Sequence, residues 1–258
     1  MEIAYTRTGS GTPLVLLHAF PLSAAMWDAQ RGGLSRDCEV ITVEQRGFGE
    51  SADLLGEQPP DLDIVVDDLA RLLDQLGLRQ VALGGLSMGG SVAMAYLRRR
   101  PEQVRGLLLA NTKASADTPE AAENRLRIAD AVEQARSSEP LMSTVFPKLL
   151  GKTTQQGSPA LTQTVEQMVR DAPWQAVAWT QRAMAARPES FDVLAAADIP
   201  VLVIAGGEDP LMTEADAEAM TKAAPQSELV TMPHVGHLSA LEDPREFNAA
   251  AQRLLHRL

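Results

Sequence analysis

The stretch Val81-Ala82-Leu83-Gly84-Gly85-Leu86-Ser87-Met88-Gly89-Gly90 decides the fold of this 258-residue chain. Its first five residues form an apolar run that predicts a buried strand, and the apolar and small residues 92–97 predict a helix after it. Between them, residues 85–89 match G-x-S-x-G. A serine in so tight a strand-to-helix turn takes up strained backbone angles and exposes its hydroxyl at the edge of the sheet. We interpret Ser87 as a candidate nucleophile rather than a capping serine in a glycine-rich turn.

Similar apolar runs lie on both sides of this stretch. They cover residues 14–18, 40–44, 104–110, 200–205 and 228–232. Their hydrophobicity is continuous rather than alternating, which is typical of strands buried on both faces. Helical periodicity at residues 65–76, and a helix start at Asp243-Pro244, separate or follow the runs. This alternation predicts an α/β fold with a doubly wound, mostly parallel sheet.

The strand signal is missing between residues 112 and 190. Ala, Glu, Gln and Arg accumulate there in the segments 121–135, 160–170 and 174–186, and prolines separate these segments. We expect several short helices that form an insertion. The predicted organisation is a core in two parts, residues 1–111 and 191–258, with a helical cap at residues 112–190.

A serine hydroxyl becomes a good nucleophile when a base takes its proton and a third group orients that base. The chain has four histidines. His18 comes too early for the expected order of serine, acid and histidine. His256 lies in the amphipathic terminal helix. His237 is favoured over His234, because the glycine before it permits a tight loop after the run 228–232.

The orienting carboxylate is expected where the strand 200–205 ends. The turn Gly206-Gly207-Glu208-Asp209-Pro210 follows that strand, and ligand sites of open α/β sheets form at the carboxyl ends of strands. Asp209 is the favoured carboxylate and Glu208 the alternative. Two backbone N–H groups should stabilise a developing oxyanion, and those of Phe20 and Met88 fit, because Pro21 has no N–H.

The composition excludes several functions. Lys and Arg total 23 against 34 for Asp and Glu, a net charge of −11 that disfavours binding to nucleic acids and anionic membranes. The single cysteine, Cys38, excludes a disulfide framework. Without an H-E-x-x-H motif or a His/Cys cluster, we predict no metal and no other cofactor. A signal peptide and a membrane-spanning run are missing too, so we expect a cytoplasmic protein of undetermined oligomeric state.

These motifs resemble those of the alpha/beta hydrolases, in the branch of small esterases, lactonases and haloperoxidase-like enzymes. The resemblance runs nearly end to end, through residues 18–23, 46–51, the serine turn, the Asp209 turn and Gly236-His237-Leu238. It implies a mostly parallel sheet with a helical lid that sets substrate choice. It also implies a triad of Ser87, Asp209 and His237 with Phe20 and Met88 as oxyanion donors. The expected substrate is a small carboxylic ester or lactone, as for 3-oxoadipate enol-lactonases and short-chain carboxylesterases.

Two other functions stay open. A haloperoxidase-like perhydrolase would use peroxide in place of water at the acyl-enzyme, and a receptor on the same fold would retain its ligand with little turnover. Tentative substrate-binding residues are Trp27, Trp174 and Trp179. The two cap tryptophans, together with Met168 and Met184, either line an apolar pocket or only pack the cap helices.

Overall fold

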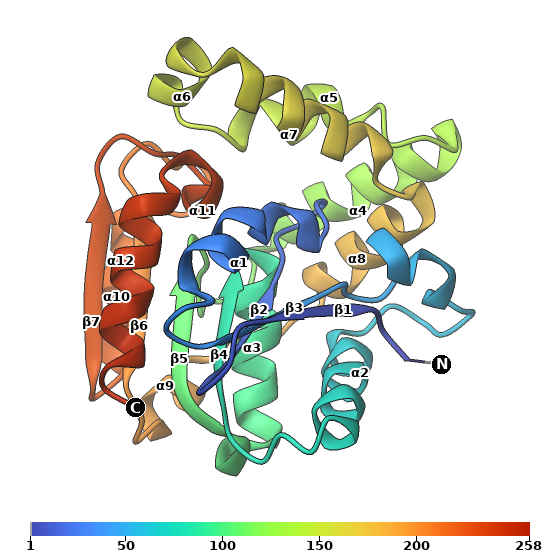
Figure 1. Cartoon of the computed structure of the whole chain (residues 1–258). Helices are drawn as coiled ribbons and strands as arrows, with labels where there is room; N and C mark the ends of the chain where they lie inside the picture. The colour runs from blue at the N-terminus through green and yellow to red at the C-terminus, as the bar shows by residue number, and fades with distance from the viewer. Residues whose placement is uncertain (1) are drawn as a thin grey trace.

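The structure is a computed structural model that describes residues 2–258, and it contains one seven-stranded sheet flanked by helices (Figure 1). The strands are β1 (Tyr5–Thr8), β2 (Pro13–Leu17), β3 (Glu39–Val43), β4 (Val81–Leu86), β5 (Val104–Ala110), β6 (Val201–Gly206) and β7 (Ser227–Met232). Across the sheet their order is β1-β3-β2-β4-β5-β6-β7. Within the described residues, β1 alone pairs antiparallel, with β3.

The helices fall into a core set and a set that lies over one edge of the sheet. The core helices are α1 (Asp28–Leu34), α2 (Leu62–Gln75), α3 (Met88–Arg99), α9 (Phe191–Ala196), α10 (Glu214–Ala223), α11 (Ser239–Glu242) and α12 (Pro244–Leu255). The other helices, called the cap helices below, are α4 (Pro119–Ala135), α5 (Leu141–Thr144), α6 (Lys152–Gly157), α7 (Pro159–Asp171) and α8 (Trp174–Ala185). Short 3-10 helices are η1 (Ala24–Trp27), η2 (Gly49–Leu54), η3 (Pro101–Gln103) and η4 (Phe146–Lys148).

Core helices cover both faces of the sheet. The chain steps from β2 through α1 to β3 in one direction, and from β4 through α3 to β5 in the opposite direction. Because such connections are right-handed, α1 and α3 lie on opposite faces. The terminal helix α12 packs beside α1, and α2 packs beside α3. The structure therefore confirms the predicted doubly wound, mostly parallel sheet.

Burial explains why the central strands were recognisable in the sequence. Every residue of β4 and β6 is buried, as are all but one residue of β2 and of β5. Side chains on both faces of these strands contact helices, so both faces select apolar residues. All four residues of the edge strand β1 are exposed, and it has no apolar run to predict it.

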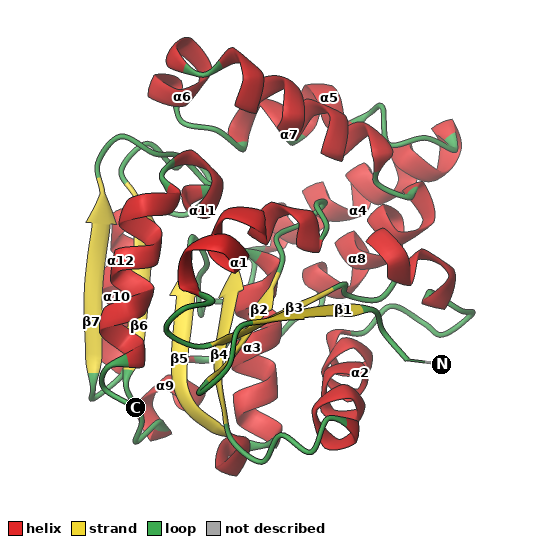
Figure 2. Cartoon of the chain, in the orientation of Figure 1, coloured by secondary structure: helices red, strands yellow, loops and turns green. Residues whose placement is uncertain are grey.

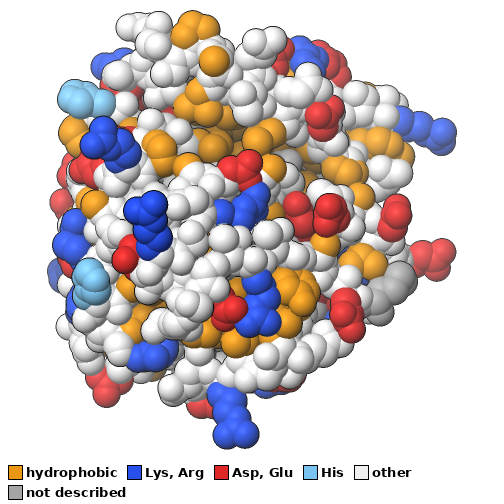
Figure 3. All heavy atoms as spheres, viewed as in Figure 1, with side chains coloured by type: hydrophobic (Ala, Val, Ile, Leu, Met, Phe, Trp, Pro, Cys, Tyr) orange, Lys and Arg blue, Asp and Glu red, His pale blue; other side chains and the backbone are white. Residues whose placement is uncertain are grey.

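In Figure 1, α5, α6 and α7 lie above the carboxyl ends of the strands and α4 and α8 lie to the right of them, and Figure 2 shows this layer as helices and loops. Within this layer α4 packs along α8, and α7 contacts both α5 and α6. In Figure 3, hydrophobic side chains gather where the layer meets the core. The division of the chain at residues 112 and 190 stays a prediction.

No helix within residues 2–258 is long and apolar enough to cross a membrane.

The strand order reverses between β2 and β4. Loops that leave the carboxyl ends of two such strands turn toward opposite faces, so a crevice opens between them. The loop after β2 contains residues 18–20, and Ser87 follows β4 directly. The segments with Phe20, Ser87 and Met88 therefore begin at this crevice, whereas Asp209 and His237 follow β6 and β7.

Candidate active site

Ser87 lies in a strained turn between β4 and α3. Its φ of 57° and ψ of −114° are unusual for a residue with a side chain. A Cβ atom placed on Gly85 would lie 2.1 Å from the backbone carbonyl of Gly89, and one placed on Gly89 would lie 2.2 Å from the carbonyl oxygen of Leu17. The Ser87 N–H donates to the carbonyl oxygen of Ala110 on β5, 2.9 Å away. Close backbone contacts on three sides thus hold the turn in place.

The structure brings Ser87, His237 and Asp209 together. His237 Nε2 lies 2.8 Å from Ser87 Oγ, and His237 Nδ1 lies 2.8 Å from Asp209 Oδ2. The side chains of His237 and Asp209 are buried. His234 and His256, in contrast, are exposed. Groups from the ends of β4, β6 and β7 therefore form one continuous hydrogen-bonded chain.

The carboxylate of Asp209 is held by several donors besides the imidazole. Its Oδ1 accepts from the N–H groups of Leu211 at 2.8 Å and Met212 at 3.1 Å, and its Oδ2 accepts from Asn111 Nδ2 at 3.0 Å. Burial acts to raise the pKa of Asp209, but His237 and these donors together hold that pKa below its ordinary value. The carboxylate is therefore ionised at neutral pH.

Glu208, the alternative carboxylate, points elsewhere. It is directed at the cap, where it accepts from the backbone N–H of Thr153 at 2.8 Å and from the Thr153 hydroxyl at 2.7 Å. Of the two neighbouring acids, Asp209 is the one that contacts His237.

Asn111 contributes to the site, although no sequence motif marks it. The residue directly follows β5 with a positive φ of 46°, a conformation that asparagine tolerates better than most residues. Its Nδ2 donates to Asp209 Oδ2 and, at 3.0 Å, to the carbonyl oxygen of Gly236. Asn111 therefore fixes Asp209 and the loop of residues 233–238, called the histidine loop below, relative to each other. The sequence feature that could have indicated this role is the position of Asn111 at the carboxyl end of a predicted strand.

Glu242 joins the histidine loop to the cap and was also missed. Its carboxylate accepts from the N–H groups of Gly236 and Leu238, beside His237. The same carboxylate accepts from the N–H of Gly151 at 2.9 Å and from the hydroxyl of Thr154 at 2.6 Å. A Cβ atom on Gly236 would lie 2.1 Å from the Gly151 nitrogen, so the two backbones are in direct contact.

Phe20 and Met88 lie at the cavity that contains Ser87 and His237. Met88 is the first residue of α3, so its N–H has no acceptor within the helix. The Phe20 N–H donates to no group within residues 2–258. The positive end of the α3 dipole adds to the attraction for negative charge at this point. Both residues predicted to supply donors thus line the same cavity as Ser87.

His18 is buried in the loop after β2 and supports that loop. Its Nε2 accepts from the N–H of Gln45 at 3.1 Å, and its Nδ1 lies 3.1 Å from the carbonyl oxygen of Ala19. Burial lowers the pKa of His18 to about 4, so the imidazole is neutral at neutral pH. These contacts account for His18 without a role as the base.

The cavity has a volume of about 210 Å³ and is lined by both core and cap residues. Its apolar lining includes Phe20, Ile128, Val145, Leu149, Met184 and Leu211. Polar and charged side chains from α4, α8 and neighbouring loops complete the wall. A small molecule with an apolar part and a polar part fits this lining.

The three tryptophans do not line this cavity. Trp27 is fully buried and packs against Phe247, with ring centroids 5.8 Å apart. Trp179 Nε1 donates to the carbonyl oxygen of Gln58 at 2.9 Å, and Trp174 packs against the hydrophobic core. The tryptophans predicted to bind substrate thus pack against other residues of the protein instead of lining this cavity.

Residues 2–258 contain no group of three or more His, Cys, Asp and Glu side chains that could hold a metal ion.

This arrangement is suited to acyl transfer. An imidazole between a hydroxyl and an ionised carboxylate can take the proton of the hydroxyl and return it to a leaving group. Two N–H groups at the same cavity can stabilise negative charge on a carbonyl oxygen.

Comparison with known proteins places the chain in a family. The pattern described as alpha/beta hydrolase fold matches residues 12–244. A thermophilic esterase from Thermogutta terrifontis, solved with malate bound, has a TM-score of 0.94 at 38% sequence identity, over 98% of this chain and 93% of that chain. A hydrolase from Pseudomonas aeruginosa PA01 has a TM-score of 0.89 at 27% sequence identity, over 98% of this chain and 94% of that chain.

Among sequences, 3-oxoadipate enol-lactonase 2 from Acinetobacter baylyi is 26% identical over 247 residues, which are 95% of this chain and 88% of that enzyme. The sheet order, the near-complete coverage and the family pattern agree with one another. The chain therefore belongs to the alpha/beta hydrolase family, and on that ground it is a hydrolase.

Proposed function

We propose that this hydrolase cleaves small carboxylic esters or lactones through an acyl-enzyme on Ser87. The observation that carries the proposal is the hydrogen-bonded chain from Ser87 Oγ through His237 to Asp209, with both distances at 2.8 Å. The family relatives described as an esterase and an enol-lactonase support this choice of substrate class.

The proposed reaction has two halves. Ser87 Oγ attacks the carbonyl carbon while His237 Nε2 takes the serine proton, and the N–H groups of Phe20 and Met88 stabilise the tetrahedral oxyanion. The C–O bond then breaks, and His237 gives the proton to the departing alkoxide. In the second half, His237 takes a proton from water, the hydroxide attacks the acyl carbon, and the acid leaves as Ser87 regains its proton. Asp209 holds the imidazole throughout.

Replacing Ser87 tests this mechanism. We expect Ser87→Ala to lower kcat on p-nitrophenyl esters or lactones by about 10⁴-fold, because no other hydroxyl replaces the nucleophile. His234→Ala is the matched control, since His234 is exposed and outside the hydrogen-bonded chain. A Ser87→Ala enzyme with the turnover of the wild type would refute the acyl-enzyme.

Two further measurements separate this hydrolase from the alternatives, a perhydrolase and a receptor. Peracid formation faster than ester hydrolysis would indicate a perhydrolase. Stoichiometric binding without steady-state product release would indicate a receptor.

A further inference from the structure

The cavity beside Ser87 has the opposite charge to the molecule as a whole. The chain has a net charge of −11. Apart from His237, however, the titratable side chains that line this cavity are three cations and one anion: Lys113, Arg125, Lys148 and Asp117. A positive cavity in an acidic protein requires an explanation.

Three cations surround the buried carboxylate of Asp117. Its oxygens lie 3.3 Å from Lys113 Nζ, 2.5 Å from Arg125 Nε and 3.0 Å from Arg187 Nη1. Burial acts to raise the pKa of Asp117, but Arg125 and Arg187 hold that pKa below its ordinary value, so the carboxylate is ionised. One negative charge balances one cation. The cluster therefore retains two positive charges.

Two of the three cations at the cavity wall, Lys113 and Arg125, contact anchoring residues. Arg125 Nη1 donates to Gln181 Oε1 at 3.1 Å, in addition to its contact with Asp117. Lys113 follows Thr112, whose hydroxyl donates to the Ser87 carbonyl oxygen at 2.8 Å. Lys113 and Arg125 thus line the cavity of Ser87 from anchored segments.

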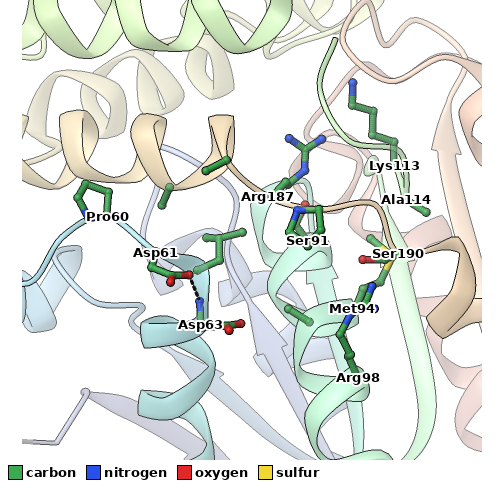
Figure 4. A pocket seen from close by; sticks show the side chains of 15 residues that line it. Pro60, Asp61, Asp63, Ser91, Met94, Arg98, Lys113, Ala114, Arg187 and Ser190 are labelled. Carbon is green, nitrogen blue, oxygen red and sulfur yellow. Dashed lines mark hydrogen bonds between the residues drawn. The ribbon is translucent and has the colours of Figure 1, made fainter. Parts of the chain in front are cut away.

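Acidic residues face this cluster on its other side. A second cavity of about 270 Å³ is lined by the cations Arg98, Lys113 and Arg187, and also by Asp61 and Asp63; Arg98 is paired with Asp192. In the view of Figure 4, the two carboxylates lie across this second cavity from Lys113 and Arg187. Toward Ser87, Asp117 is the sole acidic side chain among the described lining residues. Among the lining residues, positive charge is therefore in excess on the side of Ser87, and the nearest further carboxylate, that of Asp209, is buried behind His237.

We propose that the substrate carries a carboxylate of its own, besides the ester or lactone group, and that Lys113 and Arg125 bind this carboxylate. The inference rests on the function proposed for Ser87 and specifies its substrate class. Charge-assisted hydrogen bonds to a carboxylate are shorter and stronger than neutral ones. The cavity volume of about 210 Å³ limits the substrate to a short carbon chain, which packs against the apolar lining.

Two pairs of esters test the proposal, each differing by a carboxylate in place of a methyl group. Monomethyl succinate against methyl butyrate has the charge on the acyl side. O-acetylglycolate against ethyl acetate has it on the alcohol side. Acid release at constant pH gives kcat/KM for each compound. We expect the charged member to be favoured by about tenfold or more in at least one pair, which is about 1.4 kcal/mol.

Substitutions identify the groups responsible for this ratio. Lys113→Met should lower the ratio of charged to neutral kcat/KM by about tenfold, mainly through KM. Lys222→Met, on α10 and outside the cavity, makes the same change in net charge and should keep the wild-type ratio. In the wild type, raising the salt concentration from about 0.02 M to about 0.5 M should also lower the ratio.

The proposal is overturned if the neutral ester is equal or better in both pairs, or if Lys113→Met keeps the wild-type ratio. If neutral esters are cleaved with dependence on Ser87 but without discrimination, the proposed function survives and this inference fails. If no ester is cleaved, calorimetric titration with succinate decides. Binding that Lys113→Met weakens supports the carboxylate site, and the lack of any binding to the wild type refutes it.

Discussion

Gly85 has room for a hydrogen atom where any other residue has a Cβ. The Cβ of an alanine would lie 2.1 Å from the carbonyl carbon and oxygen of Gly89, and both are backbone atoms that cannot rotate away. We expect Gly85→Ala to separate β4 from α3, to destabilise the protein by about 2 kcal/mol, and to lower ester turnover by about 100-fold as Ser87 moves from His237. Urea unfolding and steady-state kinetics measure the two effects.

The control is Gly32→Ala. A Cβ at Gly32, inside α1, has no heavy atom within 4 Å, so alanine should stabilise the helix by about 0.5–1 kcal/mol. Equal behaviour of the two variants would contradict the close contact at Gly85.

Single residues differ in how far the sequence reveals them. Ser87, Asp209 and His237 belong to local motifs in a fixed order, so pattern and order select them. Asn111 and Glu242 act through contacts with residues up to 125 positions away, and no local pattern marks such contacts. The tryptophans show the converse, because apolar size alone does not distinguish a cavity wall from the interior.

At the scale of elements, the sequence predicts best what is buried on both sides. The limits of the parallel strands agree with the apolar runs within one residue at every end. The longer cap helices α4, α7 and α8 were recognised, whereas α5 and α6, of four and six residues, are too short for a periodic signal. Helix α10 was missed, although Thr213 and Asp216 form a capping box at its start.

The contact between α6 and the histidine loop depends on one carboxylate. In Glu242→Gln the side chain has one acceptor oxygen instead of two, and its amide donors would face the N–H groups of Gly151 and Gly236. We expect kcat/KM for esters to fall by about tenfold to 100-fold, with a lower thermal midpoint. Kinetics and thermal unfolding test this.

Glu208→Gln is the matched control, because the Glu208 carboxylate also accepts from the start of α6, while only its backbone N–H, which the substitution keeps, bonds to the histidine loop, at the carbonyl oxygen of Val235. If Glu208→Gln loses as much activity as Glu242→Gln, the effect comes from the cap alone.

For the whole molecule, His18 links stability to pH. Its folded pKa of about 4 is below the ordinary value of 6.5, so the unfolded chain binds more protons between these values. The stabilisation that comes from burying the neutral imidazole is fully present above pH 6.5. It is lost as pH falls toward 4, which lowers the free energy of unfolding by on the order of 3 kcal/mol.

Urea unfolding at pH 7 and at pH 5 measures this effect. Between these two pH values, the free energy of unfolding should fall by more in the wild type than in His18→Gln. Parallel slopes for the two proteins would show that His18 is not buried as a neutral group.

The meeting of Gly151 with Gly236 limits how this enzyme can be re-engineered. A chimaera that grafts the lid of a relative onto this core would keep the histidine loop in place only with glycine at both positions. The graft would also need an N–H and a hydroxyl directed at Glu242. Exchange of all the cap helices at once would therefore disturb the geometry of the reacting groups. Stepwise substitution of the cap residues that line the cavity is the less constrained route to a new specificity.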